Sequence, residues 1–139
     1  MKGKMEPAQI LNPAVNKETG LGTGRVMSHF VFDELPHYHK LLVTTDGGMM
    51  TYPTLEQKAQ IIENTVETLK ALGYENPKIA AVAAVEKVNP KMPETVEARE
   101  LKEMNERGEI KDCVVEGPIS LDIALDKAVS YTHLTLPTK

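Results

Sequence analysis

The chain has 139 residues, of which 41% are hydrophobic and 26% are charged, and its formal net charge at pH 7 is −4. This composition is typical of one folded domain and argues against intrinsic disorder. The lysines are interleaved with acids, which argues against nucleic acid or an anionic membrane as a partner, because both attract clustered Lys and Arg.

The N-terminal part of the chain predicts little regular structure. Residues 1–17 indicate a weak helix that Pro13 interrupts. The stretch GLGTG at 20–24 lacks the Lys-Ser/Thr end of a phosphate-binding loop, and no strand precedes it, so a plain connector is favoured. Residues 25–32 alternate in the way that is typical of a strand.

Three short apolar runs follow, at 40–45, 78–85 and 112–115, and two helical patterns separate them. The continuous run at 78–85 is what a central parallel strand requires, with helices on both faces. We therefore predict an α/β fold with a parallel sheet in a three-layer α/β/α arrangement.

Both separating helices carry recognisable ends. Thr54 and Gln57 form the pattern of a capping box, and Gly73 is placed to end that helix. Pro93 lies near the first turn of the second helix, which stops at Gly108. Gly117-Pro118 is then expected to turn the chain into a last amphipathic segment over residues 121–128.

Each apolar run ends near an acid, namely Asp46, Glu86 and Glu116, and Asp122 follows shortly after. In open α/β sheets, ligands bind beyond the carboxyl ends of the strands, so these acids are expected to converge there. Such a cluster suits a cation, acid–base chemistry or the positioning of loops. For any single acid, structural hydrogen bonding is favoured, and the functional case rests on their shared placement.

No pair of a nucleophile and a neighbouring base is recognisable in the sequence. Cys113 is the only cysteine, so no intrachain disulfide forms, and a buried, inert thiol is favoured in its apolar run. His37 and His39 have no third ligand at metal spacing, so solvated histidines are favoured and no metal is expected. Of the three arginines, only Arg25 is placed to meet an anionic group.

The sequence also indicates the compartment in which the protein is expected. No apolar run approaches the length of a membrane span, and the first residues lack a signal-peptide core. We therefore expect a cytoplasmic protein without a membrane partner. The residues alone leave open a small α/β ligand- or cation-binding module without catalytic activity.

Several phrases together resemble the phosphate acetyl/butyryl transferase family, and most of all its butyryl branch. The order and spacing of the phrases match over residues 1–128. They are NKETGLGTGRVMSH at 16–29, TDGGMMTYPTLEQKAQIIENTV at 45–66, LGYENPKIAAVAAVEKVNPKMPET at 72–95 and IKDCVVEGPISLDIALDKA at 110–128.

The resemblance implies an acyltransferase in which acyl-CoA and phosphate give acyl phosphate and CoA, with CoA as a substrate or product and no further cofactor. It implies a two-lobed fold of the isocitrate/isopropylmalate dehydrogenase type, with the active site between the lobes. It also implies that the full-length protein is a homo-oligomer. The chemistry requires a base for the CoA thiol and cationic or hydrogen-bonding groups for phosphate and the oxyanion.

The sequence departs from the family because it lacks a Ser-Arg-Ala-Asp-like phrase, which belongs to the C-terminal portion. We therefore expect residues 1–128 to be an inactive internal fragment whose catalytic residues are missing, and residues 129–139 to be a non-native tail. The positions that the resemblance places near the substrate are Ser28, Asp46, Glu116, Gly117, Pro118 and Asp122.

Overall fold

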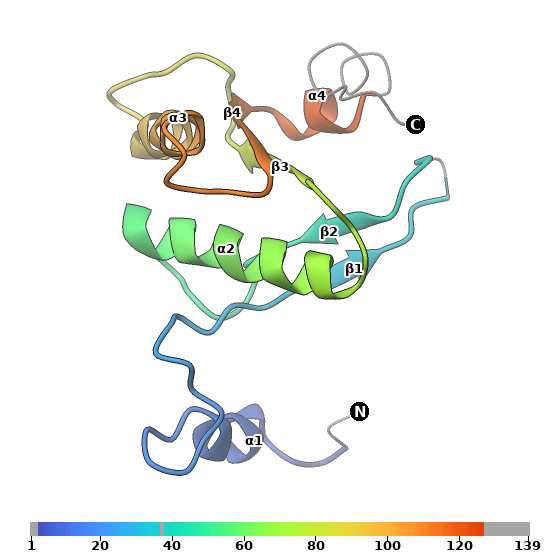
Figure 1. The fold of residues 1–139 in the computed structure, drawn as a ribbon, viewed down its shortest axis with the longest axis vertical. Coiled ribbons are helices and arrows are strands. Elements are labelled where there is room, and N and C mark those ends of the chain that lie inside the picture. The colour runs from blue at the N-terminus through green and yellow to red at the C-terminus, as the bar shows by residue number, and fades with distance from the viewer. Residues whose placement is uncertain (1–2, 37, 127–139) are drawn as a thin grey trace.

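The computed structural model describes residues 3–36 and 38–126. Residues 129–139, which we expect to be a non-native tail, lie outside the described residues, as does His37. The elements in chain order are α1 (Pro7–Ala14), β1 (Val31–Asp33), β2 (Leu42–Thr44), α2 (Leu55–Ala71), β3 (Lys78–Val82), α3 (Pro93–Glu106), β4 (Val114–Ile119) and α4 (Leu121–Leu125) (Figure 1).

The ends of the two long helices agree with the predictions. Thr54 Oγ1 accepts a hydrogen bond from the Gln57 amide at 3.3 Å, and Gln57 Oε1 accepts one from the Thr54 amide at 2.8 Å. This reciprocal pair satisfies two amides that the first turn of α2 leaves free. Gly73 and Gly108 follow α2 and α3 with φ angles of 88° and 77°, which glycine adopts without a steric penalty.

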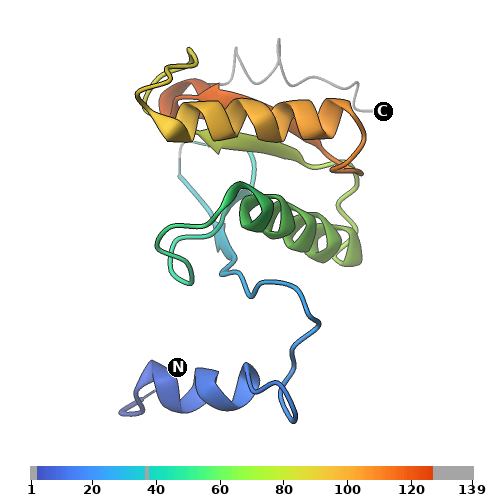
Figure 2. The ribbon, with the colours of Figure 1, turned by 90° about the vertical axis from the view of Figure 1, so that its left-hand side faces the viewer.

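The prediction that Pro13 interrupts the N-terminal helix is wrong, because α1 runs through Pro13 to Ala14. Pro13 lies one residue before the helix end, where few hydrogen bonds remain to be lost. None of the residues of α1 is buried, and both ribbon views place this helix away from the other elements (Figures 1 and 2).

The prediction of one sheet containing all three apolar runs is wrong for the part of the chain that the structure describes. β1 and β2 form an antiparallel pair, with Val31 opposite Thr44, while β3 and β4 form a separate parallel pair. β2 pairs with β1 because a short connection joins them, so closing an antiparallel hairpin costs little chain entropy. Although run 40–45 is apolar in sequence, β2 is only partly buried.

The hydrophobic core lies between α2, α3 and β4. Its most buried members are Ile110 and Val115, with 1% and 2% of their surface exposed. Figure 2 shows α3 beside the β3–β4 pair, with α2 below. Asn105 of α3 supports this core because its amide group donates to the carbonyls of Ile110 and Cys113 and accepts from the Val115 amide, so these buried backbone groups remain paired.

β3 is not buried on both faces, contrary to the prediction for the run at 78–85. Ile79 and Ala81 pack against the core, whereas Ala80 and Val82 are exposed. β3 therefore shows the alternation of a strand with one covered face. Figure 1 shows α3 and the short helix α4 on opposite sides of the strand pair, so the predicted helix layers on both sides are present in reduced form.

Gly117 and Pro118 lie inside β4, so the prediction that they turn the chain is wrong. The register passes from Ala80 opposite Glu116 to Val82 opposite Ile119, which leaves one extra residue in β4. Such a bulge accommodates Pro118, because proline has no amide hydrogen for the ladder. A Cβ added to Gly117 would lie 2.7 Å from the Ala81 Cβ and 2.9 Å from the Ala81 carbonyl oxygen.

We predict that Gly117→Ala lowers the free energy of unfolding by about 1–3 kcal/mol, because the added methyl group forces β3 and β4 apart. Urea denaturation monitored by circular dichroism measures the difference. Gly22→Ala is the matched control, since a Cβ at Gly22 meets nothing within 4 Å. Equal midpoints for the two variants would contradict the close contact.

Candidate functional site

The predicted site residues fall into separate regions rather than one row. Ser28 and Asp46 lie beside the β1–β2 hairpin. Glu116, Gly117 and Pro118 lie in β4, and Asp122 lies in α4. The prediction that the acids converge at one sheet edge is therefore wrong, because β2 does not belong to the sheet that contains β4.

Asp46 binds the backbone at the end of β2. Its Oδ1 accepts hydrogen bonds from the amides of His29 and Met49, both at 3.1 Å, and of Gly48 at 3.3 Å. Partial burial raises the pKa of this carboxyl, but the amides together outweigh burial, so the pKa lies below its ordinary value of 3.8. Its Oδ2 is buried and has no partner among the described residues.

The segment before β1 is attached to α2 by side chains rather than by a strand. Gln60 Oε1 accepts from the Val26 amide at 3.1 Å, and Asn64 Nδ2 donates to the Val26 carbonyl at 2.8 Å and to Ser28 Oγ at 3.3 Å. Thr45 Oγ1 donates to the His29 carbonyl at 2.7 Å. These bonds explain why the predicted strand at 25–32 begins only at Val31.

Sequence reasoning missed Gln60 and Asn64 as contributors to this region. Their spacing of four places both on one side of α2, next to the apolar stripe. Two amide side chains at that spacing are the signal in the sequence. They could have indicated that this side of the helix binds the backbone of an extended segment.

A cavity of about 300 Å³ lies between this segment and α2, and Ser28 and Asn64 both line it. Arg25 lines the same cavity, but its guanidinium forms an ion pair with Glu67. Arg25 is the arginine that the sequence analysis expects to meet an anionic group. Its charge is already balanced by the carboxylate of Glu67.

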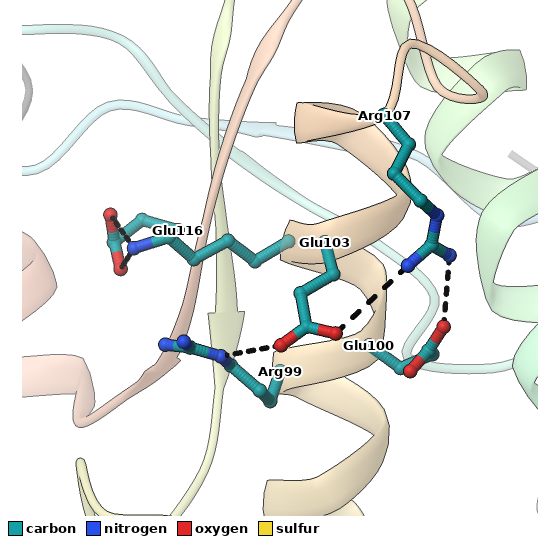
Figure 3. A network of polar contacts seen from close by, with 6 residues as sticks. Arg99, Glu100, Glu103, Arg107 and Glu116 are labelled. Carbon is teal, nitrogen blue, oxygen red and sulfur yellow. Dashed lines mark hydrogen bonds and ion pairs between the residues drawn. The ribbon is translucent and has the colours of Figure 1, made fainter.

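Glu116 faces α3 and is held by a lysine. Lys102 Nζ donates to both of its carboxylate oxygens, at 2.7 and 3.0 Å. Figure 3 shows this carboxylate beside a network along α3, in which Arg99 binds Glu103 and Arg107 binds Glu100 and Glu103. Glu116 lies in the middle of β4 and not beyond its end, so its carboxylate serves the contact between β4 and α3.

Glu86 and Asp122 approach each other through Ser120. Ser120 Oγ donates to Glu86 Oε1 at 2.6 Å, which joins the loop after β3 to the start of α4. The Ser120 hydroxyl, followed by the Ile123 amide, lowers the pKa of Asp122. Of the predicted acids, these two are the pair that the structure brings together.

The other residues considered for catalysis or metal binding show no reactive arrangement in the described part of the chain. Burial raises the pKa of Cys113 to about 11, so the thiol stays protonated at neutral pH, which agrees with the predicted inert role. Within residues 3–36 and 38–126, no three His, Cys, Asp or Glu side chains are arranged to hold a metal ion. No helix in the described part of the chain is both long and apolar enough to span a bilayer.

We predict that Asp46→Asn lowers the free energy of unfolding by about 1 kcal/mol at pH 7, because the charged acceptor of the backbone amides is lost. A carboxyl with a lowered folded-state pKa stabilises above its ordinary value of 3.8, and that stabilisation disappears as pH falls through the folded-state pKa. The difference between wild type and variant should therefore vanish in acid.

Urea denaturation of both proteins at pH 7 and at decreasing pH below 4 tests this (the limit follows from the ordinary pKa of 3.8). Glu63→Gln, an exposed change on α2, is the control and should leave stability unchanged throughout. A pH-independent loss for Asp46→Asn would show that shape, and not charge, explains its effect.

Comparisons with known proteins agree with the family resemblance of the sequence and with the fold. A family model described as phosphate acetyl/butaryl transferase matches residues 1–135. The phosphate butyryltransferase of Clostridium acetobutylicum is 47% identical over 94% of this chain, and the phosphate acetyltransferase of Thermotoga maritima is 44% identical over 88%. A crystal structure of a branched-chain phosphotransacylase from Enterococcus faecalis matches 97% of this chain with a TM-score of 0.80 and 33% identity.

These matches cover only part of each relative. The chain spans 44% of the Clostridium acetobutylicum protein, 42% of the Thermotoga maritima protein and 48% of the Enterococcus faecalis structure. The family match nevertheless extends over nearly all of this chain, and the chain therefore belongs to the phosphate acetyl/butyryl transferase family.

Proposed function

We propose that this chain is part of a phosphate acyltransferase, which exchanges the acyl group of an acyl-CoA for phosphate and releases CoA and an acyl phosphate. The observation that carries the proposal is the match to family members of both the butyryl and the acetyl branch along almost the whole chain. Since the chain spans less than half of these relatives, the activity belongs to the complete protein.

The isolated chain is proposed to be inactive. Phosphate and the developing oxyanion require cationic or hydrogen-bonding groups that are free to reach them. All three arginines are already in ion pairs, namely Arg25 with Glu67, Arg99 with Glu103, and Arg107 with Glu100. A protonated, buried Cys113 is no nucleophile, and no Ser-Arg phrase is present in the sequence.

In the complete protein, this chain would form one wall of a cleft between two lobes of the isocitrate dehydrogenase type. The catalytic residues would lie in the portion that this chain lacks. The wall residues proposed to shape the acyl or phosphate site are Ser28, Asp46, Glu116, Gly117, Pro118 and Asp122. A cytoplasmic homo-oligomer using CoA as substrate or product, without another cofactor, completes this proposal.

The alternative of a small ligand- or cation-binding module has less support. It depends on a shared acid-lined edge, but Asp46 and Glu116 belong to different sheets and Glu116 is neutralised by Lys102. A fragment of a larger enzyme needs no such convergence, and it agrees with the extent of the family match.

We predict no release of CoA above background when the purified chain is incubated with butyryl-CoA and phosphate. Free thiol is followed with a chromogenic thiol reagent, and acetyl-CoA is tested in parallel. The Clostridium acetobutylicum enzyme, under identical conditions, provides the positive control. Turnover by the 139-residue chain would overturn the proposed inactivity while leaving the acyltransferase assignment intact.

A further inference from the structure

Lys78, the first residue of β3, differs from several other lysines in its electrostatic surroundings. The ammonium groups of Lys58, Lys70 and Lys102 are each held by a carboxylate. Lys78 forms no ion pair within residues 3–36 and 38–126. Its side chain is nevertheless partly buried. A partly buried ammonium group without a counter-charge is less favourable than one in water.

A second cation acts on the same group. Lys40 precedes β2, and its positive charge reaches the side chain of Lys78. Partial burial, followed by the charge of Lys40, lowers the pKa of Lys78 below its ordinary value of 10.5. The hydrogen bond and the charge of Asp112 have the opposite effect on Lys70, whose pKa is raised. The two lysines therefore differ in how readily each gives the neutral amine.

The neutral amine is the nucleophilic form of lysine. Partial desolvation and a neighbouring cation are the two means by which proteins activate lysines for attack on carbonyl carbons, and Lys78 has both. The proposed reaction releases a suitable electrophile. An acyl phosphate is a mixed anhydride, so its acyl carbon is open to attack and its phosphate is a good leaving group.

We propose that Lys78 is acylated by the acyl phosphate that the complete enzyme releases. The ε-nitrogen attacks the acyl carbon and forms an amide bond, while the bond from that carbon to the phosphate oxygen breaks. The electron pair of the broken bond leaves with phosphate, and the nitrogen loses its proton to solvent. The proposal rests on the proposed function only for the source of the acyl phosphate.

The surroundings of Lys78 are also suited to the product of this step. Acylation removes the positive charge of a lysine. At Lys78 this loss relieves the repulsion from Lys40, whereas at Lys70 it would break the ion pair with Asp112. Acylation of Lys78 is therefore compatible with the fold.

Acetyl phosphate added to the purified 139-residue chain tests the proposal. Peptide mass spectrometry follows the acetylation of each lysine with time. We expect Lys78 to react at least about threefold faster than Lys70, because a difference of one pKa unit changes the neutral fraction tenfold. In urea the difference should disappear, since it depends on the fold. Equal rates in the folded chain, or a difference that persists in urea, would overturn the proposal.

A second acyl donor identifies the reagent. Acetyl-CoA at the same concentration, without phosphate, should label Lys78 more slowly, because a thioester is less activated and must bring the whole CoA molecule to a partly buried amine. Faster labelling by acetyl-CoA would overturn the assignment to acyl phosphate. Since acetyl phosphate is supplied directly, a negative result concerns Lys78 alone. The proposed acyltransferase activity is measured separately, by CoA release.

Three variants separate the chemistry of Lys78 from its position. Lys78→Arg keeps the charge and should lose labelling at this position, while Lys70 reacts at an unchanged rate. Lys40→Gln should slow labelling of Lys78 roughly twofold, because the ammonium form is no longer repelled. Lys87→Gln is the matched control, since it removes the same charge from an exposed position in the loop after β3.

Circular dichroism verifies that the three variants fold. Equal labelling of Lys78 in Lys40→Gln and Lys87→Gln would overturn the proposed activation by Lys40.

Discussion

The close approach of β4 to both β3 and α3 at Gly117 is the contact on which the best-packed part of this structure depends. Ala81 and the Ala98 carbonyl lie where any side chain at Gly117 would project. Because the backbones meet this closely, Val115 in the same strand reaches the core with α2 and α3. Small residues on facing elements thus determine how near three segments that are distant in sequence can come.

Short-range signals in the sequence correctly predicted the ends of α2 and α3. The capping box of Thr54 and Gln57 and the terminal glycines Gly73 and Gly108 each depend on a few neighbouring residues, and all three predictions are confirmed. The partners of the strands could not be predicted in the same way. Run 40–45 is apolar in either kind of sheet, and only the position of β1 decides that it joins an antiparallel hairpin.

In the candidate site, too, the sequence indicates which residues matter but not which residues surround them in the structure. The resemblance identifies Asp46 and Glu116 as positions of interest, but their surroundings depend on residues far along the chain, including His29 for Asp46 and Lys102 for Glu116. A carboxylate that follows an apolar run predicts a position beyond a strand end, whereas β4 continues past Glu116 to Ile119. Strand boundaries are set by pairing, which a single sequence does not display.

The attachment of residues 26–29 to α2 and to the end of β2 has a consequence for how this region tolerates change. Most of these bonds use the backbone of the segment, while the side-chain groups come from Gln60, Asn64, Thr45 and Asp46. Substitutions at Val26 and His29 leave these backbone partners in place. The side chains of Val26 and His29 are therefore free to vary, whereas Ser28 also contributes its hydroxyl to Asn64. At Val26 and His29, the requirement for particular residues falls instead on helix and loop positions that are far away in sequence.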